Sequence, residues 1–232
     1  MKRNVIAIVP AAGFVTRFGP GTNKPFHPLL DKPLIVWCLE VFEKLGEIEE
    51  VIPVLKEQDM EKGIEIFEQY SLSKIKRIAP GGEERQDSVY HGLKLLKGKA
   101  DMVLIHDGAR PLVDGGIVRT TIRNVNGFDG VVVGVPVKDT IKEVQDGLVK
   151  KTLRRETVWA IHTPQLFLYG SLMKAYELAM EEKFYSTDDA ALIERNGGKV
   201  KVIMSSYSNM KITTPEDVTV VEALLKRRAL AK

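Results

Sequence analysis

The sequence predicts an α/β fold in which a mostly parallel β-sheet lies between layers of helices. Short runs of β-branched residues alternate with longer segments of helical periodicity along most of the 232 residues. Several of the short runs are continuously apolar, which is typical of strands covered on both faces. Charged residues make up 28% of the chain, an ordinary share for a globular protein, so these apolar runs are expected to form a buried core.

The expected elements alternate in chain order. Strands are expected at Val5–Val9, Val51–Leu55, Ile75–Ala79, Met102–Ile105, Val131–Val137 and Val200–Met204. Helices are expected at roughly 33–45, 59–70, 84–97, 115–126, 170–182 and 187–197. A last helix has the clearest start, because Thr214 can cap it and Pro215 suits its first turn.

One segment, Lys138 to Gln165, interrupts this alternation because it shows no core helix. Two short β runs, Ile141–Val144 and Leu148–Thr152, flank a Gln-Asp-Gly turn and predict a hairpin. A hairpin this polar can bury little against its own domain, so it is either an exposed excursion or an arm that packs on a second subunit. The expected organisation is one domain over residues 1–232 with a β-arm at about 138–160.

Composition excludes several classes of function. The net charge of +3, from 34 basic and 31 acidic residues, predicts neither nucleic-acid nor bulk membrane binding. The single cysteine, Cys38, allows no intrachain disulfide and no zinc cluster, which indicates a reducing compartment. The first apolar run is too short for a signal peptide, and no run approaches the length of a membrane span. A cytoplasmic protein is expected.

A candidate ligand site follows the first strand, in the loop Pro10–Lys24. Ligands in open α/β sheets bind beyond the carboxyl ends of the strands, where this loop is expected to lie. Ala11, Ala12 and Gly13 are small, so a ligand can approach their backbone amides closely. The loop contains neither the Gly-Lys-Ser/Thr of a Walker motif nor the Gly-x-Gly-x-x-Gly of a dinucleotide-binding loop.

Two cations in this loop, Arg17 and Lys24, lie seven residues apart with Gly19 and Gly21 between them. Arginine offers a planar fork of donors and lysine a point charge, so a flexible loop could fold both onto one polyphosphate. A tight strand-to-helix turn with two solvated cations would contain the same residues. The loop alone leaves both interpretations open.

An acidic residue stands at the carboxyl end of another expected strand, where His106 and Asp107 follow Met102–Ile105 and precede Gly108. A carboxylate there can bind Mg²⁺ and leave positions for water and nucleotide phosphate. The alternative is an aspartate that caps the next turn. We favour the metal role, with His106 as a polar neighbour.

Three further positions have both a binding and a structural interpretation. Ser88, after a Gly81-Gly82 loop, could hydrogen-bond a base or sugar, although a capped turn explains it more simply. Thr187 stands at an expected helix start, where it could receive a phosphate or cap the helix. Lys211, on a late strand, is either an anion ligand or a solvated edge residue.

These segments together resemble one family. "VPAAGFVTRFG…NKPF", "GGEERQDSVYHGL", "HDGARPLV", "PVKDTIK", "HTPQLF", "TDDAALIE" and "NMKITTPEDV" occur in the order, and close to the spacing, of 2-C-methyl-D-erythritol 4-phosphate cytidylyltransferases. The match extends from about residue 5 to residue 225. The resemblance implies a Rossmann-like nucleotidyltransferase fold, a three-layer sandwich with a mostly parallel central sheet and a protruding β-arm. It also implies a homodimer built through the arm and a Mg²⁺-dependent step in non-mevalonate isoprenoid synthesis.

The implied reaction joins CTP to 2-C-methyl-D-erythritol 4-phosphate and releases pyrophosphate. Such a reaction needs positioning and neutralisation of phosphate charge, and Arg17 and Lys24 match the family's loop cations. Asp107 matches the acid beside Mg²⁺ and the ribose. The family's cytidine-binding positions are matched by Ala11, Ala12, Gly13, Gly82, Glu83 and Ser88.

The resemblance also assigns residues to the polyol phosphate. Thr140 and Arg155 match arm residues that reach the substrate of the partner subunit, so a complete site would require the dimer. Thr163 and Thr187 match further substrate-side positions. Lys211 matches a cation that contacts phosphate or the transition state.

The sequence departs from the family at three places. Val15 stands where a second loop glycine is common, and Glu83 stands where aspartate is common. Ser208 and Asn209 occupy the stretch where related sugar nucleotidyltransferases place a second metal-binding aspartate, so Asp107 would hold the ion with CTP oxygens and water. None of these changes removes a charge that the mechanism needs.

Three other functions remain in competition at the level of sequence. A ribitol-5-phosphate-type cytidylyltransferase would share these loops, and a sugar-1-phosphate nucleotidyltransferase would use UTP or dTTP in the same fold. A non-catalytic nucleotide sensor or scaffold is a different class of protein. The retained charges argue against it, because a sensor would not need Arg17, Lys24, Asp107, Arg155 and Lys211 together.

Overall fold

The computed structural model of the chain describes residues 3–13 and 23–230, which are built around one large β-sheet. Its strands are β1 (Val5–Pro10), β4 (Ile48–Leu55), β5 (Ala79–Pro80), β6 (Met102–Ile105), β7 (Gly130–Pro136), β10 (Trp159–Leu168) and β11 (Val200–Met204). Within the described residues their order is β11-β7-β10-β6-β1-β4-β5. Neighbouring strands are parallel, except that β10 is antiparallel to both β6 and β7. The expected, mostly parallel sheet is confirmed.

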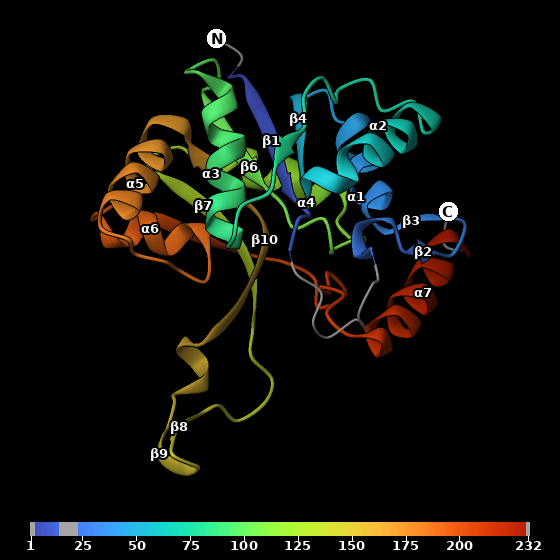
Figure 1. Cartoon of the computed structure of the whole chain (residues 1–232). Helices are drawn as coiled ribbons and strands as arrows, with labels where there is room; N and C mark the ends of the chain where they lie inside the picture. The colour runs from blue at the N-terminus through green and yellow to red at the C-terminus, as the bar shows by residue number, and fades with distance from the viewer. Residues whose placement is uncertain (1–2, 14–22, 231–232) are drawn as a thin grey trace.

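Helices cover both faces of the sheet (Figure 1). One face packs against α1 (Leu34–Glu43), α2 (Met60–Gln69) and α4 (Gly115–Arg123), and the other packs against α3 (Arg85–Leu96), α5 (Tyr169–Glu181) and α6 (Asp189–Arg195). Short 3₁₀ turns lie at Lys24–Phe26, Glu57–Asp59 and Arg155–Thr157 in the described part of the chain. The result is the three-layer α/β sandwich of the Rossmann-like type.

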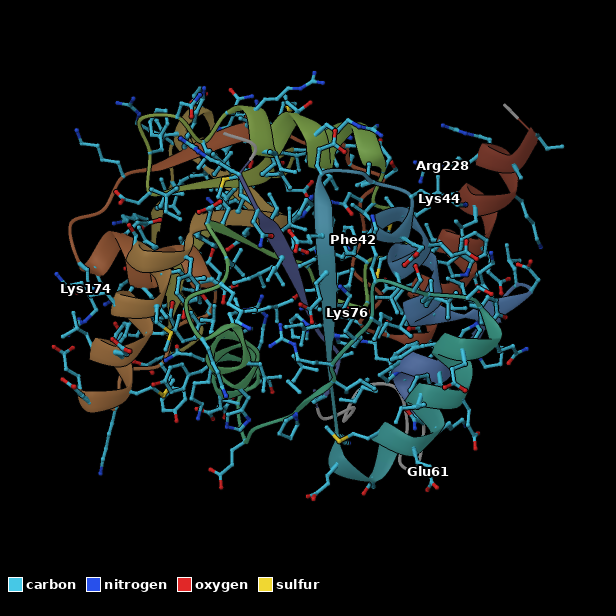
Figure 2. The ribbon with its side chains drawn as sticks, turned by 90° about the horizontal axis from the view of Figure 1, so that it is seen from above. Phe42, Lys44, Glu61, Lys76, Lys174 and Arg228 are labelled. Atoms are coloured by element: carbon cyan, nitrogen blue, oxygen red, sulfur yellow. The ribbon has the colours of Figure 1, made fainter. Side chains whose placement is uncertain are left out.

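Strand β1 shows why the sequence forms this sandwich. Val5, Ala7 and Val9 belong to the apolar cluster under α1, whereas Ile6 and Ile8 belong to the cluster under α3 and α5. Every residue of such a strand except the last is buried, so the run is apolar without alternation. Seen from above, Phe42 of α1 lies near the middle of the molecule, while Lys174 of α5 lies at its edge (Figure 2).

The last helix, α7 (Pro215–Leu230), begins at the predicted proline and packs apart from the large sheet. Its Val221 and Leu225 meet Leu29 and Leu34, which belong to the small hairpin of β2 (Pro28–Leu29) and β3 (Lys32–Pro33) and to the start of α1. The same cluster includes Ile212, which directly follows Lys211. It therefore holds the segment that carries Lys211 in place.

The segment after β7 forms the predicted hairpin, β8 (Lys142–Gln145) and β9 (Leu148–Thr152), which projects from the body of the molecule (Figure 1). Asp146 and Gly147 at its turn both have positive φ, which a two-residue turn between twisted strands favours. Every residue of the two strands is exposed, including Leu148 at 74%.

Two expectations about the strands were wrong. No strand was expected at 159–168, yet β10 inserts there between β6 and β7 and buries Thr163, Pro164 and Gln165. Polar residues around a proline hide this strand from pattern analysis. Of the strand expected at Ile75–Ala79, only Ala79 pairs with β4; Ile75 and Ile78 pack on the core from a loop.

The helices lie within a few residues of their predicted positions, but one cap differs. The α6 helix is capped by Asp188, whose carboxylate accepts from the amide of Ala191, and not by Thr187. No helix among the described residues is long and apolar enough to cross a membrane.

We expect Gly130→Ala to destabilise the sheet. A Cβ at Gly130 would lie 2.3 Å from the ring of Phe167 on β10 and 3.1 Å from the carbonyl oxygen of Leu166. Overpacking of this kind costs about 1–3 kcal/mol, measurable as a lower urea midpoint. Gly170→Ala in α5 is the control, because nothing lies within 4 Å of its added Cβ. Equal midpoints for both variants would contradict this account of the β7–β10 contact.

Candidate active site

A pocket of about 280 Å³ opens at the carboxyl ends of β1 and β6. This is the edge at which open α/β sheets bind their ligands. The residues that line it are Pro10, Ala11, Ala12, Gly13, Lys24, Pro25, Leu34, Arg85, Ser88, Asp107, Gly108, Ala109, Lys211 and Thr213.

The loops that carry Ala11 and Ala12 in the pocket are in direct contact with the loops of Gly81 and Gly108. A Cβ at Gly81 would lie 2.3 Å from the Cβ of Ala12, and one at Gly108 would lie 3.2 Å from the Cβ of Ala11. The amide of Gly81 donates to the carbonyl of Leu55 at 2.7 Å. Small residues are therefore needed here for the loops to pack, as well as for a ligand to approach the amides.

Asp107 lies at the centre of the site and contacts three cations among the described residues. Its Oδ1 accepts from Arg85 Nε at 3.1 Å, and its Oδ2 lies 2.9 Å from Lys211 Nζ and 3.5 Å from Arg110 Nε. Burial alone would raise the pKa of Asp107, but Arg85, Lys211 and Arg110 outweigh it and hold the pKa well below its ordinary value. The carboxylate is therefore ionised, and the cations around it exceed it in charge.

A chain of hydrogen bonds behind Asp107 fixes its position. Thr163 Oγ1 accepts from the Asp107 amide at 3.0 Å, so its hydroxyl proton is directed to Nδ1 of His106 at 3.1 Å. The Nε2–H of His106 then donates to the carbonyl of Arg110 at 3.1 Å. This arrangement requires a neutral imidazole, in agreement with burial, which lowers the pKa of His106 to about 4.

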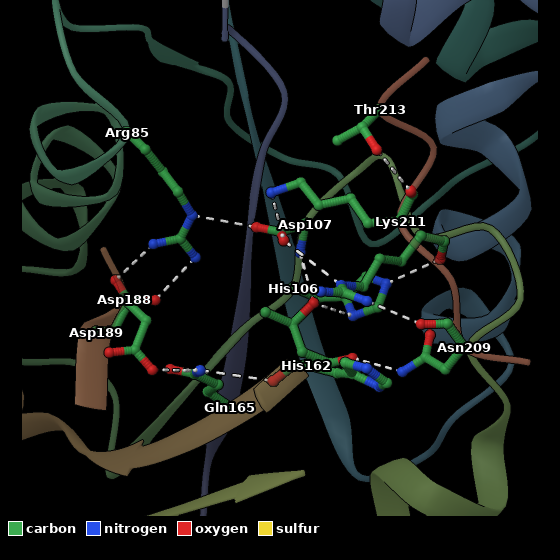
Figure 3. Close-up of polar contacts among 12 residues, drawn as sticks. Arg85, His106, Asp107, His162, Gln165, Asp188, Asp189, Asn209, Lys211 and Thr213 are labelled. Atoms are coloured by element: carbon green, nitrogen blue, oxygen red, sulfur yellow. Dashed lines mark hydrogen bonds and ion pairs between the residues drawn. The ribbon is translucent and has the colours of Figure 1, made fainter. Parts of the chain in front are cut away.

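Asn209 ties three segments together at the back of the site (Figure 3). Its side-chain Nδ2 donates to the carbonyl of Thr163 at 2.8 Å, and its own carbonyl accepts from Arg110 at 2.8 Å. The turn after Asp107, strand β10 and the segment before Lys211 are thereby held in fixed relation. Asn209 stands where related sugar nucleotidyltransferases place a second metal-binding aspartate, and in this chain it has a structural role.

The pocket gathers part of the predicted site. Seven of the residues singled out from the sequence line it: Ala11, Ala12, Gly13, Lys24, Ser88, Asp107 and Lys211. Ser88 also organises its own loop, since its Oγ accepts from the Gly82 amide at 3.0 Å and donates to the Glu84 carbonyl at 3.2 Å.

Other predicted residues do not line the pocket. Thr163 is buried behind Asp107, while Glu83 and Thr187 are exposed on their loops. Thr140 and Arg155 lie exposed at the base of the hairpin, where Arg155 donates to the carbonyl of Lys138 at 3.0 Å. Arg17 and Val15 fall outside the described residues.

Sequence analysis missed Arg85, Arg110 and Asp189. Arg85 also reaches Asp189 Oδ2 through NH2 at 2.8 Å, so it bridges two carboxylates. A signal was present for Arg85, because an arginine in the first turn of a helix faces the positive end of the helix dipole and calls for an acidic partner. No comparable signal marks Asp189, which read as part of a capped helix start.

The described residues contain no group of three or more His, Cys, Asp or Glu side chains that could hold a metal ion. Asp107 is the one carboxylate among the residues that line the pocket in the described part of the chain. The site can therefore attract and orient a polyanion, and a divalent ion would depend on that polyanion for most of its ligands.

Comparisons with known proteins point to one family. The family model described as 2-C-methyl-D-erythritol 4-phosphate cytidylyltransferase matches residues 5–227. Relatives with that name include one from Clostridioides difficile, 45% identical over 94% of this chain and 92% of its own. Another, from Geobacter metallireducens, is 41% identical over 97% of this chain and 98% of its own.

Solved structures agree with the sequence relatives. The 4-diphosphocytidyl-2C-methyl-D-erythritol synthase from Anaerococcus prevotii superposes with a TM-score of 0.85 at 31% identity, over 97% of each chain. A 2-C-methyl-D-erythritol 4-phosphate cytidylyltransferase from Francisella tularensis gives a TM-score of 0.79 at 26% identity, over 94% of this chain and 98% of that one. The fold is thus shared over nearly the whole length of the chain.

Burial of His106 predicts a pH-dependent stability. Its pKa falls from 6.5 to about 4 on folding, so between these values the unfolded chain binds a proton that the folded chain does not. The free energy of unfolding should therefore decrease as the pH falls from 6.5 to 4, by at most about 1.4 kcal/mol per pH unit for this group. His162, whose pKa burial also lowers to about 4, acts in the same direction.

Urea unfolding of the wild type and of His106→Gln at pH 7 and pH 4.5 measures this effect. The variant should be less stable at pH 7, because Thr163 loses its acceptor, yet should lose less stability between the two pH values. An unchanged pH slope in the variant would show that His106 does not titrate as described.

Proposed function

The chain belongs to the 2-C-methyl-D-erythritol 4-phosphate cytidylyltransferase family, and we propose that it transfers the cytidylyl group of CTP to 2-C-methyl-D-erythritol 4-phosphate. The products are 4-diphosphocytidyl-2-C-methyl-D-erythritol and pyrophosphate, a step of the non-mevalonate route to isoprenoids. The observation that carries this function is the pocket at the carboxyl end of the sheet, in which Lys24, Lys211 and Arg85 accompany Asp107.

In the proposed reaction a phosphate oxygen of the alcohol attacks the α-phosphorus of CTP, and the bond from that phosphorus to the pyrophosphate oxygen breaks. Charge builds on the α-phosphate and the leaving pyrophosphate, so the protein contributes positioning and cations. Lys24 from the first loop and Lys211 from the segment before α7 reach the pocket from different elements. Arg17 is proposed to join them on the triphosphate.

The nucleotide is proposed to bind along the first two loops. Ala11, Ala12 and Gly13 offer backbone amides at the triphosphate end. Gly82, Glu83 and Ser88 form the loop proposed for the cytidine, where backbone groups would read the edge of the pyrimidine. Thr163 and Thr187 are proposed to serve the polyol phosphate, and Thr163 also holds the backbone amide of Asp107.

Mg²⁺ is proposed to enter with the triphosphate, with Asp107 as its protein ligand. A single carboxylate fits this ion, because Mg²⁺ in nucleotide sites takes one or two carboxylates and completes its shell with phosphate and water. The Lys211 ammonium that lies on Asp107 Oδ2 would then be released to the substrate. When bound, the ion neutralises phosphate charge.

The hairpin is proposed to form a homodimer arm over about 138–160. Its strands expose Val144, Leu148 and Val149, which a lone chain leaves in water. Thr140 and Arg155 lie exposed beside it, outside the pocket of their own chain. We propose that they reach the polyol phosphate bound to the partner subunit.

Turnover with defined substrates tests the function. Purified protein with CTP and Mg²⁺ should release pyrophosphate with 2-C-methyl-D-erythritol 4-phosphate, and UTP or dTTP should compete weakly. Turnover with ribitol 5-phosphate alone would instead identify a ribitol-type cytidylyltransferase. Preference for UTP or dTTP with a sugar 1-phosphate would identify the sugar class, and nucleotide binding without turnover would identify a sensor.

Removing a pocket cation should slow the reaction without unfolding the protein. Lys24→Ala and Lys211→Ala are each expected to lower kcat/KM on the order of 100-fold or more, because each leaves developing phosphate charge unneutralised. Lys174→Ala, on the exposed side of α5, is the matched control and should be as active as the wild type. Near-normal turnover in either pocket variant would refute its assigned role.

Subunit mixing tests the arm. A dimer of one Lys24→Ala chain and one Arg155→Ala chain contains one site with both residues intact, provided that Arg155 acts across the interface. Random pairing then restores about one quarter of all sites, while each variant alone is nearly inactive. Failure to restore any activity after confirmed subunit exchange would place Arg155 in its own subunit's site, and normal activity of Arg155→Ala alone would place it outside the reaction.

A further inference from the structure

The first turn of α3 binds the segment 184–189 residue by residue. Gln86 donates from Nε2 to the carbonyl of Phe184 at 2.8 Å and accepts from the amide of Ser186 at 2.9 Å. Asp87 accepts from the hydroxyl of Tyr185 at 3.1 Å. These contacts join parts of the chain about 100 residues apart and hold the segment that carries Thr187.

Arg85 extends this set of contacts into the pocket. Its NH1 and NH2 bind the two oxygens of Asp189 at 3.1 and 2.8 Å, while its Nε binds Asp107 Oδ1 at 3.1 Å. Figure 3 shows the guanidinium between the start of α6 and Asp107. A planar fork that is bound on both sides has little rotational freedom.

Asp189 is the fixed end of this chain of contacts. It is the first residue of α6, is 1% exposed, and also accepts from the hydroxyl of Tyr176 in α5. A buried carboxylate is costly unless it is paired, and Arg85 and Tyr176 supply the hydrogen bonds that pair this one. Asp189 does not line the pocket, whereas Arg85, which it binds, does.

We propose that Asp189 is a positioning residue that acts through Arg85, which couples the segment 184–189 to the Asp107 carboxylate. The inference rests on the proposed function. It adds that Asp107, on the nucleotide side of the site, and the segment that carries Thr187, on the polyol side, are held as one unit. Loss of the coupling would let Asp107 rotate and the segment shift, and misplacement by about 1 Å costs on the order of 100-fold in rate.

Asp189→Asn tests the proposal, because it removes the charge that orients Arg85 and nearly keeps the shape. We expect kcat to fall roughly 10- to 100-fold and the KM for CTP to rise, with the helical content unchanged. A residue of structural importance alone would reduce the folded fraction and leave the KM of that fraction at the wild-type value. That outcome, or unchanged kinetics, would overturn the proposal.

Arg85→Lys provides a second variant for the case that Asp189→Asn fails to fold. Lysine keeps the positive charge but lacks the planar guanidinium that binds both Asp107 and Asp189. The side chain at this position is 29% exposed, so lysine can be accommodated, and the variant should show the same fall in kcat and rise in KM. The double variant should be no worse than Arg85→Lys alone, since residues that act in series are not additive. Additive losses would show that Asp189 acts independently of Arg85.

The matched control is the ion pair at the other end of α6. Arg195 NH2 binds Glu182 Oε2 at 2.8 Å, the same distance as the Arg85–Asp189 contact, but both side chains are exposed. Glu182→Gln should leave kcat and KM unchanged.

Calorimetric titration with CTP tests the coupling separately from turnover. It is run on every protein, and the affinity of Asp189→Asn for CTP is expected to be at least severalfold lower than that of the wild type. Absence of turnover in the wild type would refute the proposed function, whereas wild-type affinity in Asp189→Asn would refute the coupling.

Discussion

The ionised carboxylate of Asp107 is the point on which the site depends. It is buried at the end of β6, and an unpaired charge there would be costly, so cations must converge on it. Arg85 comes from α3, Arg110 from the turn after β6, and Lys211 from the segment before α7. Their convergence fixes three elements around one pocket and leaves an excess of positive charge in it.

The position of Asp107 depends in turn on strand β10. Thr163 on this strand holds the Asp107 amide and His106, and Asn209 holds the Thr163 carbonyl. The same strand begins at Trp159, beside the base of the hairpin. One strand therefore connects the base of the arm that is proposed to bind a partner subunit with the back of the site.

A neutral side chain, His106, and an ionised one, Asp107, are neighbours in the sequence. His106 is kept neutral by burial, and its ring meets Phe42 edge-on at 5.3 Å, so it serves as part of the core. Asp107, the next residue, is kept charged by its cations. His106 therefore supports the structure from inside the core, while Asp107 lines the pocket.

The sequence alone determined the elements whose signals are local. Continuous apolar runs identified β1, β4, β6 and β7, since a strand covered on both faces needs no polar alternation. Proline and its neighbours marked the start of α7, and the order of the motifs was enough to assign Lys24, Asp107 and Lys211 to one site. Strand β10 was not predicted, because Thr163 and Gln165 are buried polar residues beside a proline and their partners are distant in the chain. Only the tertiary structure could reveal the pairing of Arg85 with Asp189 across 104 residues. Electrostatic pairing acts through space, and two charges that meet in the fold leave no periodic pattern in the chain.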